Sequence, residues 1–213
     1  KIAVFPRQGS QTMHITADPA STAPDAVMRG MFEARKRVFV DLLGWDLPVL
    51  AGRYEVDRFD DCHARYLIVT DQDHRHLASA RLLPTLRPHI LGELFAGLCE
   101  DAPPRGPHVY EITRFCLERS ICAARRREAR NQLVTALADY ALANGITAYS
   151  GVAESGWLAQ VLAFGWRCQQ LGPPQRIGGM MLGALRIEIT PDTPALLAAA
   201  GIGSSRAAPV IDK

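Results

Sequence analysis

The stretch HVYEITRFCL at residues 108–117 predicts the strand around which the fold is organised. Apolar and aromatic side chains dominate it, and it also carries Glu111 and Arg114. The segment that follows, residues 124–144, has apolar side chains at helical spacing and ends at an Asn-Gly pair, a common helix stop. A second strand is expected at residues 146–152. Strand, helix and strand in this order predict a parallel β–α–β unit.

The segments on either side of this unit complete a mixed domain. A helical apolar stripe runs from Asp25 to Leu43 and stops at Gly44. Two strands joined by a polar turn, at residues 64–70 and 76–83, predict a hairpin. Towards the C-terminus we expect a short helix and a final strand pair, at residues 156–164, 167–170 and 181–189. The fold class is therefore α/β (α+β), a single domain with a mixed sheet and helices on its faces.

Composition narrows the function classes. The chain has 213 residues, of which 48% are apolar and 22% charged, which is typical of a globular domain with a sizeable core. A formal charge of only +2 does not favour a nucleic-acid partner. Five cysteines without CxxC spacing argue against a disulfide framework or a metal site and favour a reducing, cytoplasmic location. Without a long apolar run or a signal-peptide pattern, we expect no membrane association.

Four short motifs carry the strongest functional signal, and they occur between residues 35 and 115. They are RKRVFVDLLGW, which contains Arg35, Phe39 and Trp45; EVDRFD, which contains Glu55, Asp57 and Asp60; SARLLPT, which contains Arg81; and EITRF, which contains Glu111 and Arg114. In this order they resemble the acyl-homoserine-lactone synthase (autoinducer synthase) family. A weaker match continues through Gly165–Trp166 and the GPPQRIGG turn.

The resemblance implies a bacterial acyltransferase of quorum sensing with an N-acetyltransferase-like (GNAT-like) fold and a splayed sheet. The amine of S-adenosylmethionine would attack an acyl thioester, and lactonisation would then release methylthioadenosine. S-adenosylmethionine and the acyl thioester would be the substrates, and no prosthetic group is expected. The domain division that follows is an N-terminal segment, 1–24, partly flexible and packing on or near the active site; the synthase domain, 25–190; and a C-terminal tail, 191–213.

The motif residues suit this chemistry. The α-amine has a pKa near 8 and must lose a proton before it attacks, so Glu111 is the candidate base. Asp57 and Asp60 could hold the cationic groups of the substrate, and Arg114 completes the predicted catalytic set. The remaining motif residues are predicted to bind S-adenosylmethionine, the arginines through its carboxylate and the aromatics by packing; they are Arg35, Phe39, Trp45, Glu55 and Arg81.

Geometry sets a condition on this site. Glu111 and Arg114 are three residues apart, so in a regular strand their side chains would face opposite sides. We therefore predict a β-bulge near Ile112–Thr113, which would bring both onto one face.

The acyl donor is expected to meet the strand–helix junction at residues 117–130. The cluster Arg125, Arg126, Arg127 and Arg130 is predicted to dock an acidic acyl carrier protein or the phosphates of coenzyme A. An apolar slot between the strands at residues 108–117 and 146–152 and the helix at residues 156–164 would hold the acyl chain, lined by Val152, Trp157, Leu158, Ala159, Leu162 and Phe164. Family members that make 3-oxo signals tend to carry Thr at the position of Ala159, which hints at an acyl group without a 3-oxo substituent.

Other interpretations stay open at this point. The acids and arginines could form a surface ion-pair network, the arginine cluster a solvated helix face, and the aromatics ordinary core. The chain could also be another acyl- or acetyltransferase of the same fold acting on a different amine, or a non-catalytic binding module. Acyl length, the choice of donor and the oligomeric state are not indicated by the sequence.

Overall fold

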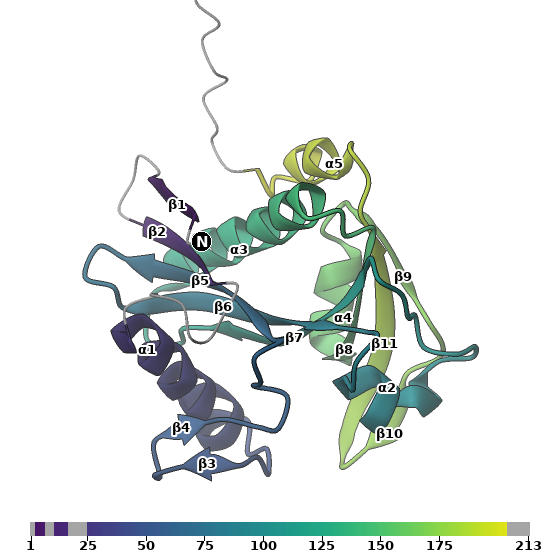
Figure 1. Cartoon of the computed structure of the whole chain (residues 1–213), viewed down its shortest axis with the longest axis horizontal. Helices are drawn as coiled ribbons and strands as arrows, with labels where there is room; N and C mark the ends of the chain where they lie inside the picture. Colours follow the sequence, from purple (N-terminus) through teal and green to yellow (C-terminus); the bar gives the residue numbers. More distant parts are fainter. Residues whose placement is uncertain (1–2, 7–10, 17–24, 204–213) are drawn as a thin grey trace, which may run out of the picture.

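The computed structural model describes residues 3–6, 11–16 and 25–203, with side chains from residue 25 onward. Nine strands of this part form one sheet. They are β1 (Ala3–Pro6), β2 (Gln11–Thr16), β5 (Arg65–Asp71), β6 (His76–Pro84), β7 (Val109–Leu117), β8 (Ala148–Glu154), β9 (Arg167–Gln170), β10 (Gln175–Ile177) and β11 (Met180–Glu188). Their order is β1-β2-β5-β6-β7-β8-β11-β10, and β9 also pairs with β11 (Figure 1).

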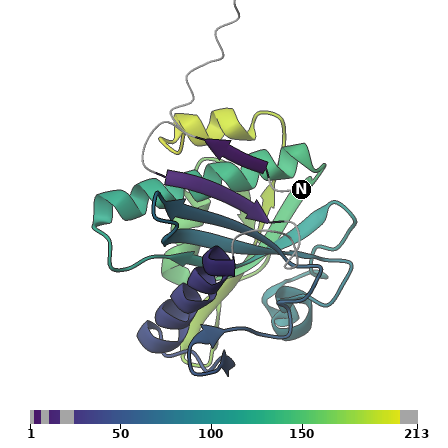
Figure 2. The ribbon, with the colours of Figure 1, turned by 60° about the vertical axis from the view of Figure 1, so that its left-hand side comes forward.

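Helices cover both faces of this sheet. They are α1 (Asp25–Arg35), the π-helix η1 (Lys36–Leu42), α2 (Ile90–Leu94), the 3-10 helix η2 (Ala96–Leu98), α3 (Ala123–Ala143), α4 (Ser155–Leu162) and α5 (Thr193–Ala199). The short strands β3 (Val49–Leu50) and β4 (Tyr54–Glu55) form a separate pair beside α1. In Figures 1 and 2, α3 and α5 lie on one side of the sheet and α1 on the other.

The main core lies under α3, α4 and α5. Leu133 and Leu137 of α3 pack with strand residues such as Leu67 and Leu185 in one buried cluster. The buried Tyr149 hydroxyl donates a hydrogen bond to the Leu137 carbonyl at 3.0 Å, which ties β8 to α3. Smaller clusters under α1, η1 and α2 occupy the opposite face. The sheet is thus buried on both sides, as three-layer packing requires.

Most predicted elements are confirmed. β5 and β6 form the expected antiparallel hairpin, and β7, α3 and β8 form the expected parallel unit. The acid-rich loop at residues 46–61 is interrupted by the small β3–β4 pair. A helix, α5, lies inside the stretch expected to be a tail.

The N-terminal expectation falls partly outside the described residues, since it includes residues 1–2, 7–10 and 17–24. In the described part, β1 pairs with β2, and β2 pairs antiparallel with β5. The N-terminal strands therefore extend the sheet at the β5 edge.

Strands β7 and β8 are paired over only three residues each. The parallel register joins Val109–Glu111 to residues 148–150 and ends at Glu111 and Ser150. Just beyond, a Cβ at Gly151 would stand 3.1 Å from the Ile112 carbonyl oxygen, so a side chain there would be crowded by the neighbouring strand. The ladder between the two strands thus ends at Glu111 and Ser150, and the expected splay lies beyond the close approach of Ile112 and Gly151.

A β-bulge interrupts the β6–β7 ladder, but not at the predicted position. Arg81 pairs with Thr113 and Ser79 pairs with Cys116, so three steps on β7 match two on β6. The extra residue falls at Arg114–Phe115 rather than at Ile112–Thr113. Arg114 adopts φ +50°, a left-handed conformation that non-glycine residues rarely take. The prediction of a bulge is confirmed, and its placement was wrong by about two residues.

Candidate active site

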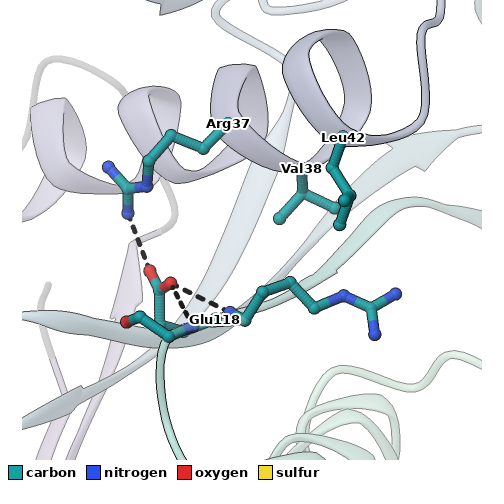
Figure 3. A pocket seen from close by; sticks show the side chains of 6 residues that line it. Arg37, Val38, Leu42 and Glu118 are labelled. Carbon is teal, nitrogen blue, oxygen red and sulfur yellow. Dashed lines mark hydrogen bonds and ion pairs between the residues drawn. The ribbon is translucent and has the colours of Figure 1, made fainter.

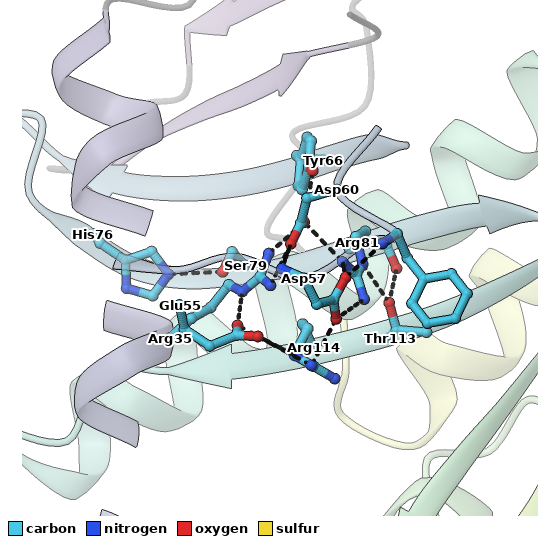
Figure 4. Close-up of polar contacts among 11 residues, drawn as sticks. Arg35, Glu55, Asp57, Asp60, Tyr66, His76, Ser79, Arg81, Thr113 and Arg114 are labelled. Atoms are coloured by element: carbon cyan, nitrogen blue, oxygen red, sulfur yellow. Dashed lines mark hydrogen bonds and ion pairs between the residues drawn. The ribbon is translucent and has the colours of Figure 1, made fainter. Parts of the chain in front are cut away.

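The four sequence motifs meet on the face of the sheet that α1 covers. Figure 4 shows six charged side chains that converge from α1, β4, the loop after β4, β6 and β7; they are Arg35, Glu55, Asp57, Asp60, Arg81 and Arg114. The bulge explains how β7 contributes twice, because it lets Arg114 reach the same side as Thr113 and Glu111. Residues far apart in sequence thereby form one connected polar network.

Arg35 lies at the innermost end of the network. Its guanidinium donates two hydrogen bonds to Asp60, at 2.8 and 2.9 Å, and one to Glu55 at 2.5 Å. The Arg35 side chain is only 1% exposed, and those of Glu55 and Asp60 are no more exposed. Each of the three guanidinium nitrogens of Arg35 thus has a carboxylate partner.

Arg81 occupies the centre. It binds Asp57 through two hydrogen bonds of 2.6 and 3.0 Å, contacts Asp60 at 2.8 Å, and donates to the Thr113 hydroxyl at 2.9 Å. Like Arg35 it is buried, with 0% of its side chain exposed. Both are predicted to bind S-adenosylmethionine, and in this structure both guanidinium groups are buried and bind carboxylates of the protein.

Arg114 and Asp57 form the outer edge. Arg114 donates to Asp57 at 2.7 Å and to Glu55 at 3.0 Å. The side chains of Arg114 and Asp57 are 9% and 10% exposed, more than those of Arg35, Arg81, Glu55 and Asp60. Any substrate approaching this network therefore meets these two side chains first.

The loop residues 57–60 are held in place by their own side chains. Asp57 accepts a hydrogen bond from the Phe59 amide, and Asp60 accepts one from the Asp57 amide, each at 2.8 Å. The Asp60 amide in turn donates to the Asp57 carbonyl at 3.0 Å. Such Asx-type turns fix both carboxylates relative to the backbone.

Electrostatics keep these carboxylates ionised. Burial alone would raise the pKa of Asp60, but the hydrogen bonds and charges of Arg35 and Arg81 outweigh it and hold that pKa well below its usual value. For Asp57, burial is likewise overcome by Arg81 and Arg114, and its pKa is also lowered. Three arginines thus balance three carboxylates.

Glu111 stands apart from this balance. It is completely buried, and its two carboxyl oxygens accept backbone hydrogen bonds from Ile90 and Leu91 at 2.7 and 2.8 Å. Burial raises its pKa to about 7, although the two amide hydrogen bonds and the charges of Arg81 and Arg114 act in the opposite direction. A carboxyl group with this pKa can exchange a proton near neutral pH, as a general base must.

Two buried participants were missed by sequence reasoning. The Tyr66 hydroxyl donates to Asp60 at 2.8 Å, and Thr113 accepts from Arg81. Tyr66 reads as an ordinary apolar strand residue. Thr113 could have been noticed because it lies between two motif residues, Glu111 and Arg114.

Phe39 and Trp45 form an aromatic wall beside the network. Their rings stack with centroids 4.9 Å apart and an interplanar angle of 21°. The Arg114 guanidinium lies over Phe39 at 5.7 Å, so the wall reaches the outer edge of the network. Phe39 is buried in a small core cluster, whereas Trp45 is partly exposed.

The predicted acyl-chain residues are only partly brought together. Trp157 packs between Phe115 and Phe164, with ring centroids at 4.8 and 5.7 Å, and Leu158 and Leu162 join the same core cluster. Val152 instead packs on the opposite face of the sheet, with the cluster under α2. Ala159 is exposed on α4, so its position does not support a place in this pocket.

The arginine cluster lies at the beginning of α3. Arg127 is exposed, whereas Arg126 contacts the carbonyls of Arg119 and Ile121 at 3.5 and 3.4 Å. Arg125 lies 3.8 Å from Asp71, and the Arg130 guanidinium lies 5.1 Å from the Phe164 ring centroid. The four side chains therefore differ in how much charge they present to solvent.

Comparison with known proteins identifies the family. A family model described as autoinducer synthase matches residues 21–193. The chain belongs to the autoinducer synthase family. An acyl-homoserine-lactone synthase of Ralstonia nicotianae is 33% identical over 185 residues, which is 84% of this chain and 90% of the relative. One from Acinetobacter nosocomialis is 31% identical over 170 residues, covering 73% and 88%.

Solved structures agree. The CoA-dependent acyl-homoserine lactone synthase BjaI, with SAM and isopentyl-CoA, aligns with a TM-score of 0.80 and 27% identity over 92% of each chain. A putative N-acetyltransferase from Lactobacillus plantarum, at 18% identity and a TM-score of 0.59, shares the fold. The synthase is thus an acyltransferase with a GNAT-like fold.

The alternative of a non-catalytic binding module is set aside. Among the described residues of this synthase, no helix is long and apolar enough to span a membrane.

Proposed function

We propose that the chain makes an N-acyl-homoserine lactone from S-adenosylmethionine and an acyl thioester. The amine nitrogen attacks the acyl carbon, an amide bond forms, and the thiol leaves. A methionyl carboxylate oxygen then attacks the γ-carbon, the carbon–sulfur bond breaks, and methylthioadenosine leaves. The observation that carries the proposal is the Arg114–Asp57 edge on the same face as the buried Glu111, at the point where β7 and β8 part.

S-adenosylmethionine suits this outer edge. Its carboxylate matches the Arg114 guanidinium, which binds carboxylates in a planar fork. Its cationic sulfonium or amine matches Asp57, whose carboxylate is kept ionised by Arg81 and Arg114. The Phe39–Trp45 stack offers an apolar surface for the adenine or the methionyl arm.

Glu111 is the proposed base. With a pKa near 7 it can take a proton from an α-amine whose pKa is about 8. The two amide hydrogen bonds occupy only part of its acceptor capacity, because a carboxylate has about four lone-pair positions. They fix its orientation and leave positions for the proton, received directly or through a water molecule.

The inner residues act by positioning. Arg35, Glu55, Asp60 and Arg81 are buried and bind one another, so their proposed task is to hold Asp57 and Arg114. The left-handed backbone of Arg114 needs such support, because strained conformations persist only where the surroundings fix them.

The acyl donor is proposed to approach from the carboxyl end of β7. A cavity of about 360 Å³ lies there between η1 and the start of the β7–α3 connection. Figure 3 shows its apolar Val38 and Leu42 side chains and the ion pair between Arg37 and Glu118, 2.7 Å apart. BjaI and MesI are CoA-dependent synthases. For this chain, coenzyme A and an acyl carrier protein both fit an entrance with Arg37, Arg119 and the exposed Arg127.

Product analysis of the purified protein tests the proposal. The chain is incubated with S-adenosylmethionine and a panel of acyl thioesters on coenzyme A and on acyl carrier protein. We expect an N-acyl-homoserine lactone and methylthioadenosine in equal amounts, detected by mass spectrometry. Release of thiol without lactone, or turnover of a different amine in place of S-adenosylmethionine, would replace the proposal with another acyltransferase activity of the same fold.

A further inference from the structure

Three polar side chains form a row across the sheet where β7 and β8 part. Ser150 on β8 is the register partner of Glu111 on β7 and of Arg186 on β11. Directly paired residues on neighbouring strands point to the same face, about 5 Å apart. Ser150 therefore lies on the face of Glu111, immediately beside it.

Two members of the row have buried polar atoms without a partner. The Ser150 side chain is completely buried, and its hydroxyl makes no hydrogen bond to any residue that the structure describes. The same holds, within the described chain, for Nε of Arg186. Buried donors are nearly always satisfied, so an unpaired hydroxyl and an unpaired guanidinium nitrogen on paired residues call for an explanation.

The surroundings of the row are apolar. The next register pair on the same face is Val152 and Ala184, and both pack with Leu91 and Leu182 under α2. An apolar chain lying on this surface would leave the Ser150 hydroxyl unsatisfied, at a free-energy cost. An oxygen atom placed there would remove that cost.

We propose that Ser150 donates a hydrogen bond to an oxygen of the acyl group. The Arg186 guanidinium is a second hydrogen-bond donor on the same face, next to Ser150. This inference rests on the proposed function, since it takes Glu111 as the base that deprotonates the attacking amine. The acyl carbon must then lie within reach of Glu111, and Ser150 is adjacent to that point.

Two oxygens of an acyl donor could meet this hydroxyl. One is the thioester carbonyl, which gains negative charge as the amine adds and which every donor carries. The other is an oxygen substituent on the first carbons of the chain. Both oxygens are hydrogen-bond acceptors. Two acyl thioesters that differ only in that substituent tell them apart.

The experiment compares wild type with Ser150→Ala and Arg186→Met, using hexanoyl and 3-hydroxyhexanoyl thioesters on the same carrier. We expect Ser150→Ala to lose about tenfold or more in kcat/KM for the donor, with the KM for S-adenosylmethionine unchanged. A loss of kcat/KM with both thioesters identifies the thioester carbonyl as the acceptor for Ser150. A loss with the 3-hydroxyhexanoyl thioester alone identifies the oxygen substituent. Arg186→Met should lower kcat/KM for the same acyl donor or donors as Ser150→Ala does.

Thermal unfolding separates this role from a structural one. Removing an unpaired buried hydroxyl should leave the Tm of Ser150→Ala unchanged or higher. Ser79→Ala is the matched control, because the buried Ser79 hydroxyl is paired with His76 at 2.9 Å; its Tm should fall while donor kinetics stay near wild type. Donor kinetics within twofold of wild type in Ser150→Ala, or a loss that follows a lowered Tm, would overturn the inference. A wild-type protein that makes no lactone from any donor would instead defeat the proposed function.

Discussion

Arg114 donates a 2.7 Å hydrogen bond to Asp57, and these two side chains are the accessible edge of a network whose other charged members are buried. Arg35 makes equally close contacts to Asp60 at the opposite end of the network. We therefore expect the burial of each arginine, and not its residue type, to decide whether it binds substrate or holds other residues in place. Substitutions at Arg114 and Arg35 should separate these two roles.

Arg114→Gln should mainly weaken binding. Its guanidinium is proposed to meet the substrate carboxylate, so we expect the KM for S-adenosylmethionine to rise about tenfold or more. Arg35→Gln should mainly unfold the protein, because it leaves Glu55 and Asp60 buried without their shared partner, a loss of about 3–5 kcal/mol. Steady-state kinetics and chemical denaturation of both variants check the contrast. An Arg35→Gln protein of normal stability would contradict it.

Glu111→Gln should abolish most of the turnover. The amide side chain cannot act as a base, and its NH₂ group would face one of the two backbone amides that now donate to the carboxyl oxygens. We expect kcat to fall by about 10²–10⁴-fold. Quantifying lactone by mass spectrometry measures the loss, and circular dichroism controls for folding. A variant that keeps more than half of the wild-type kcat would remove Glu111 from the role of base.

The pH dependence of activity should follow Glu111. Burial raises its pKa to about 7, and only the ionised form accepts a proton. The donor kcat/KM should therefore rise as pH increases through 7, and Glu111→Gln should lack this rise in its residual activity. Rate profiles between pH 5.5 and 8.5, with S-adenosylmethionine saturating, provide the measurement.

Stability should change with pH in the opposite direction. The native state keeps the Glu111 proton up to about pH 7, whereas the unfolded chain releases it near the ordinary value of 4.5. Between these values the unfolded state binds fewer protons, so the free energy of unfolding falls as pH rises. Denaturant titrations at pH 5 and pH 7 should show a smaller difference for Glu111→Gln than for wild type. Equal differences would mean that Glu111 is ionised in the folded protein well below pH 7.

Tyr66→Phe tests the support of Asp60 from β5. The variant removes a 2.8 Å hydrogen bond to a carboxylate and leaves the ring in place. We expect a loss of about 1.5–3 kcal/mol in the free energy of unfolding, the usual contribution of a hydrogen bond to a charged group. Because Asp60 also binds Arg35 and Arg81, the network should persist and the KM for S-adenosylmethionine should change little. A large change in that KM would mean that Tyr66 shapes the substrate edge itself.

Arg127→Glu tests the proposed donor entrance. Arg127 is exposed on α3, so reversing its charge should raise the KM for a carrier-protein or coenzyme A donor about threefold or more and leave the KM for S-adenosylmethionine unchanged. Arg176→Glu, on the exposed strand β10 at the other end of the sheet, is the matched control for net charge. Equal effects of the two variants would indicate a long-range charge effect and no docking at α3.

The sequence predicted the fold well because its signals are local. Apolar runs, the Asn-Gly stop and the β–α–β order are properties of short segments, and the hairpin of β5 and β6 and the parallel pairing of β7 and β8 followed from them. The bulge could be predicted from the spacing of Glu111 and Arg114. Its position could not, because which residue takes the left-handed conformation depends on the ion pairs that Arg114 makes across the fold.

The site residues were found, but their depths were not. Arg35, Arg81 and Arg114 carry the same chemical group, and only tertiary packing buries the first two. Ser150 carried no signal, since a single serine in a strand is common. Val152 and Trp157 were expected in one pocket, yet alternation along β8 and the start of α4 directs them to opposite faces.

The π-helix η1 lies inside the first motif, so it affects how many residues separate Arg35 from Phe39 and Trp45. It places the Leu43 amide 3.0 Å from the Val38 carbonyl, one residue further along than an α-helix would. Deleting one residue between Lys36 and Val38 could restore an α-helix with every motif side chain still present. Because the π-helical turn holds one residue more than an α-helical turn, Phe39 would then keep about the same direction relative to Arg35. A relative with one residue fewer in this segment therefore keeps the site geometry if the segment is α-helical there.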